Sequence, residues 1–196
     1  MPEEGLIKIK PSAFMKIALH TFRFWVSNNS SDNEMVIGLL LGYLEEDTRH
    51  VEDAIPFTHT QNRNIEMDDE FMAKIGQINK QQLEINSINE VIGWYRSTND
   101  KIRFSARDIK NHIQFQNFNS KFIGLIFSPP QYLEPEEYGF SVFRLRGEEY
   151  YNMMSDYRKI PWEIEKIEDP NMIVHNFQTF IENYFQDKPL ITEYNE

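Results

Sequence analysis

An apolar run that ends in a cluster of polar residues does most to constrain how this 196-residue chain can fold. The run Val91-Ile92-Gly93-Trp94-Tyr95 has the composition of a buried strand, and the polar stretch 96–100 begins where such a strand would end. Ser105 is followed at a spacing of three by Asp108, just before a stretch with apolar residues at helical spacing. This pattern is typical of a capped helix start. The sequence therefore predicts a buried strand, a polar loop and a helix in succession.

These residues resemble a known family of metalloprotease-like domains. The segment Gly93-Trp94-Tyr95-Arg96-Ser97-Thr98, with Ser105 and Asp108 behind it, is similar to the active-site strand and helix of the JAB1/MPN/Mov34 (MPN) domain family. Catalytic members carry histidines at the positions of Arg96 and Thr98, and these histidines bind zinc together with the aspartate at the position of Asp108. The resemblance covers roughly residues 6 to 146 and includes the strand 122–127.

The metal-binding positions depart from that catalytic pattern. Arg96 and Thr98 replace the two histidines, so Asp108 alone keeps a metal-ligand side chain. A catalytic zinc takes three protein ligands, and a guanidinium is always charged. We therefore expect Arg96 to repel a metal ion and to pair with Asp108. Glu34 stands four residues before Gly38, whereas the general base of the family stands three before, and a shift by one residue turns a side chain to the other face of a strand.

The resemblance then implies a noncatalytic protein with no metal and no cofactor. The degenerate site comprises Glu34, Arg96, Thr98, Ser105 and Asp108. In motif detail the chain resembles the noncatalytic branch of the family that includes subunit h of translation initiation factor 3. Such a domain is expected to serve as a scaffold subunit. It would pair with a second MPN-domain protein in a multisubunit complex of the initiation factor 3, proteasome lid or signalosome type.

Three other interpretations of these residues remain open at this point. Ser105 and Asp108 could only start a helix, with Arg96 an exposed charge at a strand end. A divergent zinc isopeptidase acting on ubiquitin-like proteins would need Glu34, Asp108 and His112 to converge. An RNA-associated module would use a basic cluster and one aromatic residue. Its members are Lys101, Arg103, Arg107, Lys110 and Trp94.

Composition narrows the class of protein further. A hydrophobic content of 40% is enough for a sizeable core, which argues against a disordered chain. The absence of cysteine excludes a cysteine nucleophile and a cysteine-based zinc finger. The net charge of -11 argues against general nucleic-acid binding. No apolar stretch reaches the ~18 residues of a membrane span, and the first residues lack the features of a signal peptide. We expect an intracellular, cytoplasmic protein.

Periodicity predicts one mixed α/β domain over residues 1–146, with a curved sheet flanked by helices. The predicted strands are 6–9, 36–45, 50–57, 91–95, 122–127 and 140–145, and the predicted helices are one capped by Ser12, one around Phe71, Ile75 and Ile78, and one after Ser105. A turn at 46–48 should join the second and third strands as a hairpin. The segment 129–138 is predicted to be a rigid loop.

Residues 147–196 form a predicted acidic helical extension with eleven acidic and four basic side chains. Pro161 is expected to break the chain between two helices, and Asp169-Pro170 has the pattern of another helix start. One apolar stripe follows, which could pack on the domain core or bind a partner subunit. Its residues are Ile173, Phe177, Phe180, Ile181, Tyr184 and Phe185.

Overall fold

The computed structural model describes residues 5–25, 35–60, 69–135, 137–146 and 156–166. Within these ranges the elements run in the order β1 (Ile7–Ile9), α1 (Pro11–Phe24), β2 (Met35–Glu45), β3 (Thr48–Thr60), α2 (Asp69–Glu84), β4 (Glu90–Ser97), α3 (Ala106–Phe118), β5 (Ile123–Phe127), α4 (Pro129–Tyr132), β6 (Phe140–Leu145), β7 (Tyr157–Ile160) and β8 (Trp162–Ile164).

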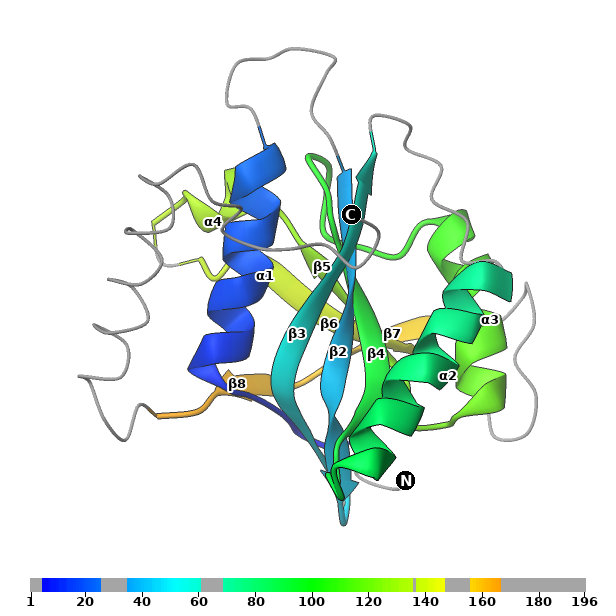
Figure 1. The fold of residues 1–196 in the computed structure, drawn as a ribbon. Coiled ribbons are helices and arrows are strands. Elements are labelled where there is room, and N and C mark those ends of the chain that lie inside the picture. The colour runs from blue at the N-terminus through cyan, green and yellow to red at the C-terminus, as the bar shows by residue number, and fades with distance from the viewer. Residues whose placement is uncertain (1–4, 26–34, 61–68, 136, 147–155, 167–196) are drawn as a thin grey trace.

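A single mixed sheet separates two layers of helices (Figure 1). The strand order is β7-β6-β5-β4-β2-β3-β1-β8. The pairs β1–β3, β1–β8 and β4–β5 are parallel, and the other pairs are antiparallel. Helix α1 lies on one face of the sheet, while α2 and α3 lie on the other. This arrangement confirms the predicted mixed sheet flanked by helices, including the β2–β3 hairpin.

Side-chain alternation along β4 divides the core between the two faces. Tyr95 packs in the cluster that includes Ile17 of α1, and Trp94 packs in the cluster that includes Phe115 of α3. Both Trp94 and Tyr95 are 0% exposed. A strand buried on both faces reads as a continuous apolar run. The apolar run around Gly93 is therefore a central strand of the sheet.

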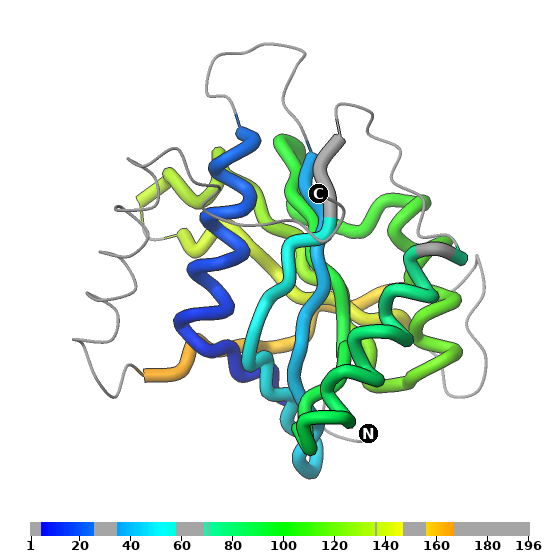
Figure 2. The backbone as a smooth tube through the Cα atoms, viewed as in Figure 1, coloured from blue at the N-terminus to red at the C-terminus, as the bar shows by residue number. Residues whose placement is uncertain are grey.

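The two edge strands are consecutive in the chain. β7 pairs with β6 at one edge and β8 pairs with β1 at the other, yet Pro161 alone separates them. The carbonyl of Pro161 also accepts a hydrogen bond from the backbone nitrogen of Ile7 at 3.0 Å. The segment 157–164 therefore crosses from one edge of the curved sheet to the other, as the yellow to orange part of the tube shows (Figure 2). The crossing therefore supplies both edge strands of the sheet, and both are short.

This crossing corrects the prediction of helices on both sides of Pro161. Both neighbours of the proline are strands, and Ile160 is 3% exposed in the cluster on the α1 face. Proline lacks a backbone N–H and is tolerated where no ladder bond is needed, which is the case between two strands with different partners. The division into a domain 1–146 and an extension 147–196 stays a prediction, but the described part of that extension belongs to the sheet.

Two further local predictions are wrong. α1 begins at Pro11 with Lys10 in the N-cap position and no side-chain cap, so Ser12 lies inside the helix. Proline suits the first helical position because its fixed φ is helical and no N–H is needed there. The segment 129–138 also begins with the short helix α4. Among the helices of the described residues, none is long and apolar enough to cross a membrane.

Candidate functional site

The end of strand β4 places Arg96 beside the start of helix α3. Successive side chains of a strand point to opposite faces, so Arg96 shares the face of Trp94. That face is covered by α3, which contributes Phe115 to the same cluster. The next residue, Ser97, is 4% exposed, and its hydroxyl accepts a hydrogen bond from the backbone nitrogen of Val36 in β2 at 3.0 Å. The strand end is therefore fixed to its neighbour while Arg96 reaches toward the helix.

Ser105 and Asp108 form the predicted capping box at the start of α3. The Ser105 hydroxyl accepts from the backbone nitrogen of Asp108 at 3.2 Å, and the Asp108 carboxylate accepts from the backbone nitrogen of Ser105 at 2.6 Å. The Ser105 hydroxyl also donates to the same carboxylate at 2.7 Å. Both residues thereby satisfy backbone donors that a helix start leaves free. This confirms the interpretation of the pair as a helix start. The Asp108 carboxylate also accepts hydrogen bonds from Arg96.

Arg96 and Asp108 form a bidentate ion pair, which confirms the predicted pairing. Nε of Arg96 donates to Oδ1 of Asp108, and Nη2 donates to Oδ2, both at 2.7 Å. The side chains are 12% and 7% exposed, respectively. The guanidinium also donates to the backbone oxygen of Ser97 at 3.0 Å. Arg96 is therefore not an exposed charge at a strand end, and a planar fork of this kind is specific to arginine.

The donor set around Asp108 does not fit a zinc ion. Its carboxylate accepts two hydrogen bonds from Arg96 and two from Ser105. Three of these bonds converge on Oδ2, and Oδ1 accepts from Arg96. The bidentate guanidinium therefore places a permanent positive charge against both oxygens, where it opposes the approach of a metal cation. Within the ranges that the structure describes, no group of three or more His, Cys, Asp or Glu side chains is placed to hold a metal ion.

Thr98 lies just past β4 and bonds within its own loop. Its hydroxyl accepts from the backbone nitrogen of Asp100 at 3.1 Å, and its backbone nitrogen donates to Phe127 of β5 at 2.8 Å. The residue is 7% exposed. Thr98 therefore shapes the turn that follows the strand. Glu34, the remaining member of the predicted site, lies outside the described residues.

His112 lies one turn after Asp108 but is bonded to a core residue. It is 0% exposed, and its Nδ1 accepts from Nε1 of Trp94 at 3.0 Å. An indole nitrogen only donates, so the neutral ring carries its proton on Nε2, which is buried with no hydrogen-bond partner among the described residues. Gln116, one helical turn further along α3, does not supply that partner. Its side-chain amide accepts from the backbone nitrogen of Leu145 at 3.0 Å and donates to the backbone oxygen of Leu145 at 3.1 Å.

Burial lowers the pKa of His112 to about 3, and the positive charge of Arg144 adds to the effect. The ring is therefore neutral at physiological pH. In this tautomer neither nitrogen offers a free lone pair, because Nδ1 accepts from Trp94 and Nε2 carries the proton. The geometry does not bring His112 into a metal site with Asp108.

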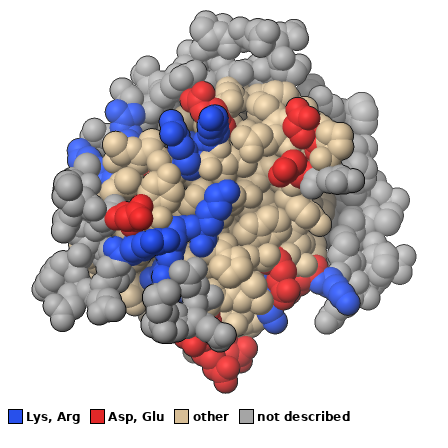
Figure 3. Space-filling model, turned by 180° about the vertical axis from the view of Figure 1, so that it is seen from behind, with Lys and Arg blue, Asp and Glu red and all other residues tan. Residues whose placement is uncertain are grey.

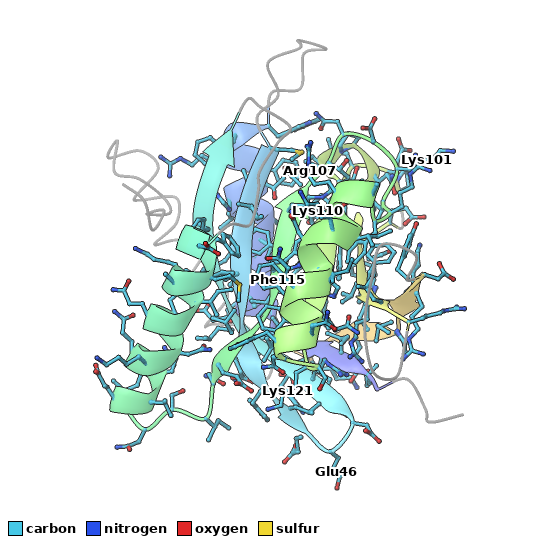
Figure 4. The ribbon with its side chains drawn as sticks, turned by 90° about the vertical axis from the view of Figure 1, so that its right-hand side faces the viewer. Glu46, Lys101, Arg107, Lys110, Phe115 and Lys121 are labelled. Carbon is cyan, nitrogen blue, oxygen red and sulfur yellow. The ribbon has the colours of Figure 1, made fainter. Side chains whose placement is uncertain are left out.

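The predicted basic cluster gathers at the N-terminal end of α3. Lys101, Arg103, Arg107 and Lys110 are all exposed, and the labelled side chains of Lys101, Arg107 and Lys110 lie at the same end of the helix (Figure 4). Trp94 does not join them, because it is 0% exposed and stacks on Phe104 with a centroid distance of 5.6 Å. The predicted role of Trp94 as an aromatic contact for RNA is therefore wrong.

Two buried contacts near the site were not predicted from the sequence. Nδ1 of His20 in α1 and the hydroxyl of Tyr95 lie 2.8 Å apart in a buried hydrogen bond between the helix and the sheet. A Cβ at Gly38 would lie 2.3 Å from two ring atoms of Tyr95, so the absence of a side chain there lets the ring lie against β2. A histidine in an apolar helix opposite a strand tyrosine is a weak signal for such a bond.

The apolar stripe from Ile173 to Phe185 lies outside the described residues.

The fold and site define a mixed α/β domain in which a polar strand end is joined to a capped helix by a nearly buried ion pair. The family described as JAB1/Mov34/MPN/PAD-1 ubiquitin protease matches residues 5–121. The chain belongs to this family.

Two relatives share 25% identity with the chain. COP9 signalosome complex subunit 5 of Neurospora crassa matches over 143 residues, or 70% of this chain. The F component of eukaryotic translation initiation factor 3 from Dictyostelium discoideum matches over 125 residues, or 64% of this chain. The chain spans 40% and 41% of the lengths of these relatives. The predicted similarity to subunit h of initiation factor 3 in particular stays a prediction.

Proposed function

We propose that this chain is a noncatalytic MPN domain that acts as a scaffold subunit inside the cell. The observation that carries this proposal is the ion pair between Arg96 and Asp108, with both bonds at 2.7 Å. It puts a permanent cation where catalytic relatives hold zinc, and it uses the one carboxylate of the site that the structure describes. Without a metal, a domain of this family lacks the means to activate a water molecule for peptide hydrolysis.

The names of the relatives support a role in an assembly. Both matched proteins are described as subunits, one of the COP9 signalosome and one of initiation factor 3. We propose that this chain likewise works by binding other subunits, among them a second MPN-domain protein. The apolar stripe at Ile173, Phe177, Phe180, Ile181, Tyr184 and Phe185 is the candidate contact in the C-terminal region.

The zinc isopeptidase alternative has less support. It would require His112 to turn from its bond with Trp94, and Asp108 to release Arg96. Breaking a buried ion pair by withdrawing one partner costs about 3–5 kcal/mol, which zinc binding would have to supply. The family description names a ubiquitin protease, so hydrolysis of ubiquitin chains is the activity against which the proposal is tested.

Co-purification from the source cells tests the proposal. The full chain, tagged at one end, is isolated under native conditions. The proteins that co-purify with it in every preparation are identified by mass spectrometry. A second MPN-domain protein present at a fixed ratio is the expected result. The same preparation, after separation of the subunits, is assayed for cleavage of ubiquitin chains. A chain that stays alone and cleaves ubiquitin would show that the proposal is wrong.

A further inference from the structure

The segment that carries the ion pair is basic in an otherwise acidic chain. Residues 96–110 hold five basic and two acidic side chains, whereas the whole chain has a net charge of -11. One of the two acidic residues is Asp108, whose charge is balanced by Arg96 at 2.7 Å. The other is Asp100, an exposed residue in the loop. The segment itself therefore carries an excess of positive charge that the ion pair does not neutralise.

Four residues make up this surface, which we call the α3 basic surface: Lys101, Arg103, Arg107 and Lys110. All four are exposed. In the described part of the chain no ion pair joins Lys101, Arg103 or Lys110 to another residue. In the view from behind, basic side chains also gather toward the left and centre, with acidic side chains scattered around them (Figure 3). Clustered charge of one sign is what steers and orients a partner of opposite charge.

The loop that presents two of these cations is held in place by the site itself. Nη2 of Arg96 lies 3.5 Å from the backbone oxygen of Arg103, and the Thr98 hydroxyl bonds the backbone of Asp100 at 3.1 Å. Phe104 is 4% exposed and stacks on Trp94, which anchors the end of the loop in the core. The backbone positions that carry these cations, on the loop and on the first turns of α3, are therefore held relative to one another, which lowers the cost of ordering the loop on binding.

We propose that the α3 basic surface binds an acidic segment of a partner protein. Carboxylate side chains can form charge-assisted hydrogen bonds with the four neighbouring lysine and arginine side chains. Single-stranded RNA fits less well, because its recognition relies on exposed aromatic rings for base stacking. The aromatic residues beside this surface, Trp94 and Phe104, are buried. The overall charge of -11 would also repel a polyanion that extends beyond the surface.

This inference is independent of the proposed function, since a zinc enzyme could carry the same surface. The test uses a short fluorescent peptide rich in Glu and Asp, and a single-stranded RNA of similar length, each titrated with the full chain. The variant Lys101→Glu/Arg103→Glu reverses two cations of the surface. The matched control is Lys159→Glu/Lys166→Glu, which reverses two exposed cations on β7 and just after β8 and gives the same net charge. Thermal unfolding checks that both variants fold.

The expected result is that the peptide binds the unaltered chain, and that affinity falls at least about tenfold in the surface variant. The control variant should bind the peptide within about threefold of the unaltered chain. Raised salt should weaken binding, because exposed charges are screened. Neutralising Lys101→Gln/Arg103→Gln should give an intermediate loss. Absence of peptide binding, an equal loss in the control, or tighter binding of RNA than of peptide would each overturn the proposal.

Discussion

Arg96 at the end of β4 and Asp108 in the first turn of α3 are joined by two parallel hydrogen bonds, each 2.7 Å long. The two residues are twelve positions apart in the sequence. The pair links a central strand of the sheet to the helix that covers it, and the capping bonds of Ser105 complete the carboxylate's partners. Arg96, Ser105 and Asp108 together define the helix start and hold the loop between strand and helix. They also engage the Asp108 carboxylate in hydrogen bonds within the protein.

Replacing Arg96 with alanine should lower the free energy of unfolding by about 3 kcal/mol, because it leaves the nearly buried Asp108 carboxylate without its charged partner. Chemical denaturation of the purified variant measures this loss. Lys101→Ala serves as control, because that exposed side chain makes no ion pair within the described ranges, and it should change stability by less than about 0.5 kcal/mol. An Arg96→Ala protein as stable as the unaltered chain would mean that the ion pair contributes nothing.

The buried His112 predicts a loss of stability in mild acid. Its pKa falls from 6.5 to about 3 on folding, so the unfolded chain binds a proton in a range where the folded chain does not. The stability that the neutral His112 ring contributes to the folded chain is fully present above pH 6.5. It is lost as the pH falls toward about 3, and the free energy of unfolding decreases by at most about 1.4 kcal/mol for each pH unit.

Denaturation curves between pH 7 and pH 4 measure that effect, and the variant His112→Gln isolates it from the carboxylates. The glutamine does not titrate and keeps an acceptor for Trp94. Its stability should depend less on pH than that of the unaltered chain. Parallel pH profiles for the two proteins would contradict a depressed pKa at His112.

Two glycines should respond to alanine in opposite directions. A Cβ at Gly38 would lie 2.3 Å from the ring of Tyr95, whereas one at Gly76 in α2 would meet nothing within 4 Å. Gly38→Ala should therefore destabilise the fold by about 2 kcal/mol through overpacking. Gly76→Ala should stabilise it by up to about 1 kcal/mol, because alanine is the better helix former. Thermal unfolding distinguishes the two, and a stable Gly38→Ala variant would argue against the contact with Tyr95.

The crossing strand predicts a core residue in a region that the sequence pattern assigned to a helical extension. Ile160 of β7 is 3% exposed and its neighbour Lys159 is exposed. Ile160→Ala should cost about 3 kcal/mol of unfolding free energy through lost burial and a cavity. Lys159→Ala should cost less than about 0.5 kcal/mol. Equal, small effects at both positions would place this segment outside the core.

Local sequence patterns predicted the parts of the fold that depend on neighbours in the chain. The apolar run around Gly93 indicated a central strand because that strand is buried on both faces, and the spacing of Ser105 and Asp108 indicated the helix start because the cap is a local arrangement. The charge of Arg96 three residues past Gly93 was enough to predict the ion pair once the family resemblance placed it near Asp108.

Features that depend on distant parts of the chain were missed. β7 and β8 are short and flank a proline, and β8 finds its partner Ile7–Ile9 at the other end of the chain. Nothing in residues 157–164 alone signals that partner, and the local pattern around the proline predicts a break between helices instead. The bonds of His20 to Tyr95 and of Trp94 to His112 likewise join separate elements. Tertiary packing determines these contacts, and local propensity does not.

The zinc content of the full chain tests the central claim most directly. The protein is purified without chelators and without a histidine tag, incubated with zinc, passed through a desalting column and measured by elemental analysis. The ion pair between Arg96 and Asp108 predicts a zinc content far below one ion per chain. An equimolar content that is retained through desalting and lost in Asp108→Ala would contradict the proposal of a noncatalytic domain and identify a zinc site.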